Sequence, residues 1–184
     1  MTFVYRRKNS IRLKGYDYSQ PGAYFVTIVV KGRQCVLGEV VDGRILLSPL
    51  GRIVEIVWQD LPNHYPHVKL DAFCVMPNHV HGIIVINDLD NSIGAGSDHV
   101  GAGLRSPLWG KPAPTMDHGL PEIIRGFKTF SARRINEYRN TPGQAFWQRN
   151  YYDHIIRDDE EWQRLMDYLL ANPSCWNTDR NFTT

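Results

Sequence analysis

Two histidines separated by one residue, His79 and His81, are the side chains best suited to bind a metal ion. They open an apolar run, 79–86, that we interpret as a central β-strand, in which alternate side chains point to the same face. Both imidazoles would therefore project side by side, and neutral imidazole is a common ligand of transition metals. Burying two imidazoles without partners is costly, which favours a site. Two histidines that alternate without binding anything also fit so short a motif.

A tyrosine and an asparagine near the end of the sequence, Tyr168 and Asn172, stand four residues apart. We expect a helix there, because the acids at 158–161 complement a helix dipole at its start and Pro173 ends a helix. Residues four apart share a helix face, so a hydroxyl and an amide oxygen would be presented together, the oxygen as a third metal ligand. Taken alone, the pair also fits a tyrosine at the core edge and an asparagine near a helix C-terminus.

The elements that must position these residues form an α+β pattern. Without a hairpin turning at Asp42-Gly43 and the last helix, the order is β-α-β-β-α-β, a ferredoxin-like antiparallel sheet with helices on one face. Ser48 and Pro49 predict the start of the first helix, and Pro62 its end. The predicted strands are 24–30, 68–75, 79–86 and 151–157, the hairpin spans 36–47, and a further helix runs from Leu120 to Thr141.

Composition excludes several classes of protein. The 184 residues are 42% hydrophobic and 22% charged, as in one ordinary globular domain. No apolar run approaches the ~18 residues of a membrane span, and no apolar segment follows the basic start as a secretion signal requires. The three cysteines are far apart and suggest no disulfide or zinc site, so we expect a cytoplasmic protein. They are Cys35, Cys74 and Cys175.

The formal net charge of +2 is unevenly distributed. We divide the chain into a basic arm at 1–21, a domain at 22–176 with a flexible Gly/Pro-rich insertion at 88–119, and a tail at 177–184. Two basic groups are candidates for contacts with nucleic-acid phosphates, although a charge run can also be a solvated face. They are Arg6, Arg7, Lys8, Arg12 and Lys14 in the arm, and Arg125, Lys128, Arg133 and Arg134 in the helix after Pro121.

Three blocks together resemble a known family. They are MPNHVHGIIVI at 76–86, FWQRNYYDHIIR at 146–157 and DYLLANP at 167–173. In this order and spacing they are similar to the HUH-type single-tyrosine transposases, and most to the REP-associated tyrosine transposases. The resemblance covers about 22–176. The family's paired histidines fall on His79 and His81, its nucleophilic tyrosine on Tyr168 and its helix-borne polar ligand on Asn172. The insertion at 88–119 has no role that the family supplies.

The resemblance implies a metal-assisted enzyme that cleaves and rejoins single-stranded DNA at hairpin-flanked sites through a 5′-phosphotyrosine. It implies Mg²⁺ or Mn²⁺ as cofactor, hairpin DNA as partner, no membrane association, and a basic arm that resembles a hairpin-recognition element. Relatives act as monomers or as homodimers that exchange the tyrosine helix, so both states stay open.

Two other functions also stay open. The chain could be a domesticated relative that binds DNA hairpins without transposing them. A small metal hydrolase or cupin is the third hypothesis, but a cupin supplies a glutamate soon after the second histidine, where this sequence is apolar from Gly82 to Ile86.

Overall fold

A four-stranded antiparallel sheet forms the centre of the computed structural model, which describes residues 15–88, 118–179 and 181–182. The strand order is β4-β5-β1-β6, with β1 hydrogen-bonded to both β5 and β6. This order, with every neighbour antiparallel, confirms the predicted ferredoxin-like α+β fold. The strands are β1 (Gly22–Val29), β4 (Val68–Met76), β5 (His79–Ile86) and β6 (Tyr152–Ile156).

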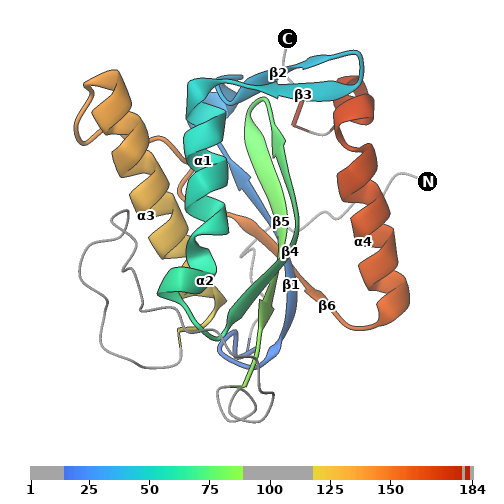
Figure 1. Ribbon diagram of the computed structural model, residues 1–184. Coiled ribbons are helices and arrows are strands. Elements are labelled where there is room, and N and C mark those ends of the chain that lie inside the picture. The colour runs from blue at the N-terminus through green and yellow to red at the C-terminus, as the bar shows by residue number, and fades with distance from the viewer. Residues whose placement is uncertain (1–14, 89–117, 180, 183–184) are drawn as a thin grey trace, which may run out of the picture.

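Helices cover both faces of the sheet (Figure 1). The first face carries α1 (Pro49–Gln59) and α3 (Leu120–Arg139), the two crossover helices of the predicted topology. The opposite face carries α4 (Asp159–Ala171), followed by the short helix η3 (Pro173–Thr178). The extra C-terminal helix therefore covers the face that the crossover helices leave open.

The alternation of side chains along the strands divides the interior into two cores. On the face of α1 and α3, Val26 and Val80 pack with Trp58 and Phe127 in the larger core. Strand residues that alternate with Val26 and Val80 point to the opposite face, toward α4. There Phe25 and other apolar side chains form a smaller core. That smaller core comprises Phe25, Cys74, Met76, Ile83, Ile156, Leu169 and Trp176.

The predicted hairpin is present as β2 (Gly38–Val41) and β3 (Arg44–Leu47). Its two turn residues, Asp42 and Gly43, have φ angles of 50° and 71°. Positive φ at both central positions is the geometry of the tight hairpin turn for which Asp-Gly is favoured. The hairpin packs against η3, at the end of α4 (Figure 1).

Helix α1 begins as predicted but ends differently. The Ser48 hydroxyl caps it by accepting from the Gly51 amide at 3.1 Å, and Pro49 occupies the first turn. The predicted end at Pro62 is wrong, because α1 stops at Gln59 and a separate turn, α2 (Leu61–His64), carries Pro62 in its own first turn. Proline lacks only an N–H that the first turn of a helix does not use, so it can begin a helix as well as end one.

Several features predicted from the sequence lie at or beyond the edges of the described residues. The five cations of the arm and most of the 88–119 insertion lie outside them. Of the arm, Tyr18 is buried in the larger core, and of the tail, Phe182 packs on Trp176. The three cysteines are free thiols. No helix in the described part of the chain is long and apolar enough to span a membrane.

Substitution of Gly82 should destabilise the fold. A Cβ at this position would lie 2.3 Å from Cζ2 of Trp58, which stacks on Phe73 with ring centroids 4.5 Å apart. Because the tryptophan has to move, we expect Gly82→Ala to lower the free energy of unfolding by about 1–3 kcal/mol. Urea denaturation measures this. Ile56→Ala, at an exposed position of α1, is the control and should change stability by less than about 0.5 kcal/mol. Equal stability of Gly82→Ala and wild type would contradict the packing argument.

Candidate active site

The two histidines of β5 lie side by side on the face of the sheet that α4 covers. His79 and His81 are 0% and 3% exposed, and their Nε2 atoms are 2.9 Å apart. Val80, between them, is buried in the larger core on the opposite face. The geometry predicted from strand alternation is therefore present.

Two neighbours fix the orientation of the imidazoles. The side-chain amide of Asn78 donates to the carbonyl oxygens of Arg33 and Asn181, which turns its Oδ1 toward Nδ1 of His79 at 2.8 Å. An amide oxygen only accepts, so the proton of His79 is on Nδ1 and the Nε2 lone pair faces the site.

The hydroxyl of Thr27 lies 2.8 Å from Nδ1 of His81, its register partner across the β1–β5 ladder. A hydroxyl can donate or accept, so it can accompany either tautomer of His81. Outer partners of this kind orient metal-binding histidines. Sequence reasoning missed Asn78 and Thr27. Thr27 can be identified only once the register of β1 against β5 is known.

The environment keeps both imidazoles neutral. Burial lowers the pKa of His79 to about 4; the Arg33 guanidinium acts in the same direction, while the Asp179 carboxylate opposes it. Burial, together with the neighbouring His79, lowers the pKa of His81 well below its ordinary value. A histidine must be neutral to ligate a metal, so the site is ready to do so at neutral pH.

Helix α4 brings the predicted tyrosine to this pair. The side chain of Tyr168 is 44% exposed, but its hydroxyl lies 3.3 Å from Nε2 of His81 and its ring meets the edge of Phe25. Burial and the Asp179 carboxylate raise the pKa of Tyr168 to about 12, while the amide of Asn172 favours the phenolate. The phenol is therefore protonated at neutral pH.

Asn172 lies one helical turn beyond the tyrosine and faces the same way. It is 2% exposed, and its amide nitrogen makes no hydrogen bond of good geometry, although it lies close enough to the Tyr168 oxygen to favour the phenolate. An N–H group needs an acceptor, so this unpaired nitrogen does not itself indicate a cation; a metal ion would be bound by the amide oxygen. Its role as a metal ligand remains a prediction.

An aspartate that sequence reasoning did not identify joins the group. The ligand atoms of His79, His81 and Asp179 lie within 4.8 Å of one another. Asp179 follows η3, so its place depends on how the chain turns after Pro173, which no local pattern reveals.

These side chains fit a divalent cation. Two neutral nitrogens about 3 Å apart have the spacing of neighbouring ligands on an ion with bonds of roughly 2.1 Å. Amide and carboxylate oxygens are the donors that Mg²⁺ and Mn²⁺ prefer. The donor set therefore suits the metals that the sequence predicted.

Contacts at the first turn of α4 fix the position of this helix on the sheet. Asp158 caps the helix by accepting from the Glu161 amide at 2.7 Å. Nε2 of His154, on β6, lies 2.6 Å from the Glu161 carboxylate, which also accepts from the Arg157 amide at 3.0 Å. His154 thus anchors the tyrosine helix to β6.

Three of the predicted DNA-binding arginines form ion pairs on α3. Arg125 pairs with Glu122, Arg133 lies 3.1 Å from Glu137, and Arg134 lies 3.6 Å from the same residue. Since α3 covers the face opposite to the histidine pair, these cations lie away from the candidate site (Figure 1). Contact with DNA by this helix stays a prediction.

Lys128, the fourth predicted DNA-binding cation of α3, makes structural hydrogen bonds. Its ammonium donates to the main-chain oxygens of Gln148 at 2.5 Å and Arg149 at 2.9 Å, and burial lowers its pKa. It therefore holds the segment before β6 against α3, which leaves its charge less available to a phosphate.

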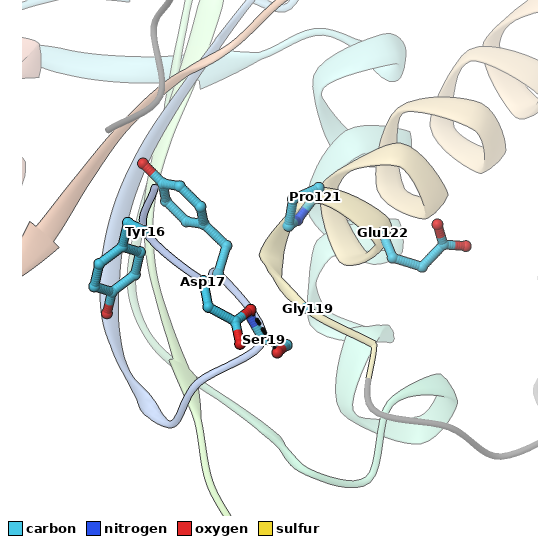
Figure 2. A pocket seen from close by; sticks show the side chains of 7 residues that line it. Tyr16, Asp17, Ser19, Gly119, Pro121 and Glu122 are labelled. Carbon is cyan, nitrogen blue, oxygen red and sulfur yellow. Dashed lines mark hydrogen bonds between the residues drawn. The ribbon is translucent and has the colours of Figure 1, made fainter. Parts of the chain in front are cut away.

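A separate surface pocket of ≈ 430 Å³ lies between the segment before β1 and the start of α3 (Figure 2). It lies toward Gly22, at the far end of β1 from the strand partner of His79, roughly 23 Å along the strand. Asp17 and Glu122 are among the residues that line it, and no lysine or arginine of the described residues does. We assign this pocket no part in the chemistry of the histidine pair.

Comparison with known proteins finds relatives that cover most of the chain. No protein-family model matches the chain. A Haemophilus influenzae protein of uncharacterised function is 35% identical over 176 residues, which are 94% of this chain and 92% of that protein. A second Haemophilus influenzae protein, described as a candidate REP-associated tyrosine transposase, is 23% identical over 157 residues, covering 85% of this chain and 73% of that protein.

The similarity to the second of these proteins supports the resemblance to the REP-associated tyrosine transposases. Two solved structures are also similar. One is a REP-associated tyrosine transposase bound to a REP hairpin, with a TM-score of 0.49 at 18% identity, covering 94% of this chain and 73% of that one. The other is a candidate transposase from Deinococcus radiodurans, with a TM-score of 0.42 at 19% identity, covering 86% and 95%.

Removal of the hydroxyl behind His81 should weaken metal binding. Thr27→Val keeps the shape of the side chain but leaves Nδ1 of His81 without its partner. We expect the affinity for Mn²⁺, measured by calorimetry, to fall roughly 10–100-fold. Thr129→Val, on the exposed side of α3, is the matched control and should bind as wild type does. Unchanged affinity of Thr27→Val would show that this hydroxyl does not orient the ligand.

Acid should destabilise the protein through the histidine pair. Their pKa values in the unfolded chain are near 6.5, whereas in the folded chain that of His79 is about 4 and that of His81 is well below normal. Below about pH 6.5 the unfolded chain binds protons that the folded chain does not, so the free energy of unfolding falls with the pH. Urea denaturation in EDTA between about pH 5 and pH 8 measures this slope. His81→Gln should give a shallower slope, and an equal slope would contradict the assignment.

Proposed function

We propose that this protein is a metal-assisted transposase that cleaves and rejoins single-stranded DNA at hairpin-flanked sites. Tyr168 is the nucleophile, and His79, His81 and Asn172 hold a divalent metal ion. The observation that carries the proposal is the approach of the phenol oxygen to within 3.3 Å of Nε2 of His81. A nucleophile and a metal site that meet in this way are what cleavage of a phosphodiester requires.

The phenol explains why strand cleavage would be reversible. Its oxygen loses a proton and attacks the scissile phosphorus, the bond to the 3′ oxygen breaks and that oxygen takes up a proton, and the tyrosine keeps the 5′ phosphate. A phenol with an ordinary pKa near 10 is a far better leaving group than an alkoxide, so a free 3′-OH can later displace it. Phosphodiester bond energy is conserved, and no ATP is needed.

The protein groups around the phenol prepare this step. When bound, the ion polarises the scissile phosphate and offsets negative charge on its non-bridging oxygens. Asn78 and Thr27 hold the ligating imidazoles in one orientation. Asn172 favours the phenolate form of Tyr168, in opposition to the burial that raises its pKa.

Hairpin DNA is the proposed partner, in keeping with the similarity to a candidate REP-associated tyrosine transposase. Cations of the arm and the arginines of α3 would contact phosphates away from the cleaved bond. The tyrosine and both histidines come from one subunit, so the proposal does not require a dimer.

Replacement of the nucleophile tests the proposal. Tyr168→Phe should abolish the covalent, SDS-resistant adduct with end-labelled hairpin single strands in Mg²⁺ or Mn²⁺, because the attacking oxygen is gone. Hairpin affinity, measured by gel shift, should stay within about twofold, since surface polar groups contribute little each. Tyr138→Phe, at a 60% exposed tyrosine of α3, is the matched control and should form the adduct normally.

Two outcomes would contradict the assignment. An adduct formed by Tyr168→Phe would mean that another residue attacks the phosphate. Wild-type protein that binds hairpins but forms no adduct with either metal would be a domesticated hairpin-binding protein instead.

A further inference from the structure

We propose that the carboxylate of Asp179 is an anionic ligand of the ion at His79 and His81, so that the ion ties β5 to the chain that follows η3. This inference rests on the proposed function, because that function requires an ion at the histidine pair. It adds a ligand from a segment that neither strand alternation nor the spacing of Tyr168 and Asn172 identifies.

The main chain holds the carboxylate in place with one oxygen turned to the site. The amide of Asp179 donates to the oxygen of Trp176 at 3.0 Å, and its carbonyl accepts from Phe182 at 3.0 Å. Its Oδ1 accepts from the Asn181 amide at 2.5 Å. Its Oδ2 is left facing the site, 3.5 Å from the hydroxyl of Tyr168.

The segment around Asp179 is itself anchored to the histidine strand. The oxygen of Asn181 accepts from the amide of Asn78, the residue that also orients His79. The ring of Trp176 lies 6.1 Å from the His79 imidazole, and Phe182 packs on that tryptophan. Because the carboxylate is already ordered, little conformational entropy is lost when it binds an ion.

The negative charge of Asp179 is the main reason to expect it as a ligand. Two neutral, buried imidazoles bring no negative charge, and Arg33 lies close enough to depress the pKa of His79. A divalent ion there needs a compensating anion, because an unpaired charge is costly at a buried site. Asn172 is neutral and cannot supply it. Carboxylate oxygen is also the donor that favours Mg²⁺ and Mn²⁺, whereas an imidazole site alone suits Zn²⁺ better.

Calorimetric titration of the EDTA-stripped, full-length protein with MnCl₂ tests the proposal. Asp179→Asn keeps the size of the side chain and an Oδ1 that can accept from Asn181, but removes the charge. We expect its affinity for Mn²⁺ to be at least ~10-fold weaker than that of wild type. Asp167→Asn is the matched control, since this carboxylate of α4 is exposed, accepts from the Gln163 amide at 3.0 Å and is not part of the His79, His81 and Asp179 cluster; the affinity of this variant should equal that of wild type.

Two further readouts separate a lost ligand from general damage. Thermal unfolding in EDTA should be unchanged in Asp179→Asn, while the upward shift in Tm that Mn²⁺ gives wild type should shrink. The loss of affinity should also be smaller for Zn²⁺ than for Mn²⁺, because the imidazoles remain.

The outcomes distinguish this inference from the function on which it rests. If His79→Ala loses Mn²⁺ binding and Asp179→Asn binds as wild type does, the carboxylate is not a ligand and the inference is wrong, while the proposed metal site stands. If His79→Ala also binds Mn²⁺ normally, the ion is not at the histidine pair, and both proposals fail.

Discussion

Two buried imidazoles with their Nε2 atoms 2.9 Å apart impose the main constraint on this structure. Burial keeps both imidazoles neutral, so they can face each other without repulsion between two positive charges. A buried imidazole needs a partner for its other nitrogen, which Asn78 provides for one ring and Thr27 for the other. Because Thr27 lies on the neighbouring strand, the register of β1 against β5 is part of the site as well as of the fold.

The two faces of the sheet carry cores of different size. The larger core under α1 and α3 contains Trp58, Phe127 and most of the fully buried apolar side chains, so it provides most of the hydrophobic stabilisation. The smaller core under α4 can therefore accommodate polar groups close to the sheet. On that face the tyrosine helix is held by Leu169, by the pair of His154 with Glu161, and by the chain after η3. The histidine pair and Tyr168 thus lie on the face that carries the smaller core.

Much of this arrangement was predictable from local patterns. Strand alternation predicted that His79 and His81 share a face, and helical spacing predicted that Tyr168 and Asn172 do; both pairs meet where α4 crosses the sheet. The Asp-Gly turn and the Ser48 cap were also found by local rules. Pro62 was misjudged because proline is compatible with the end of one helix and the first turn of the next, and sequence alone did not separate these cases.

What the sequence by itself determined is the set of elements and the face on which each reactive side chain lies, because those depend on periods of two and 3.6 residues along one segment. Only the tertiary structure decided which strand partner supports His81, on which face of the sheet α4 packs, and how the chain after Pro173 returns Asp179 to the histidines. It also placed the α3 cations away from the site and committed Lys128 to main-chain oxygens. These relations join residues far apart in the chain, and packing and register, which act between segments, determine them.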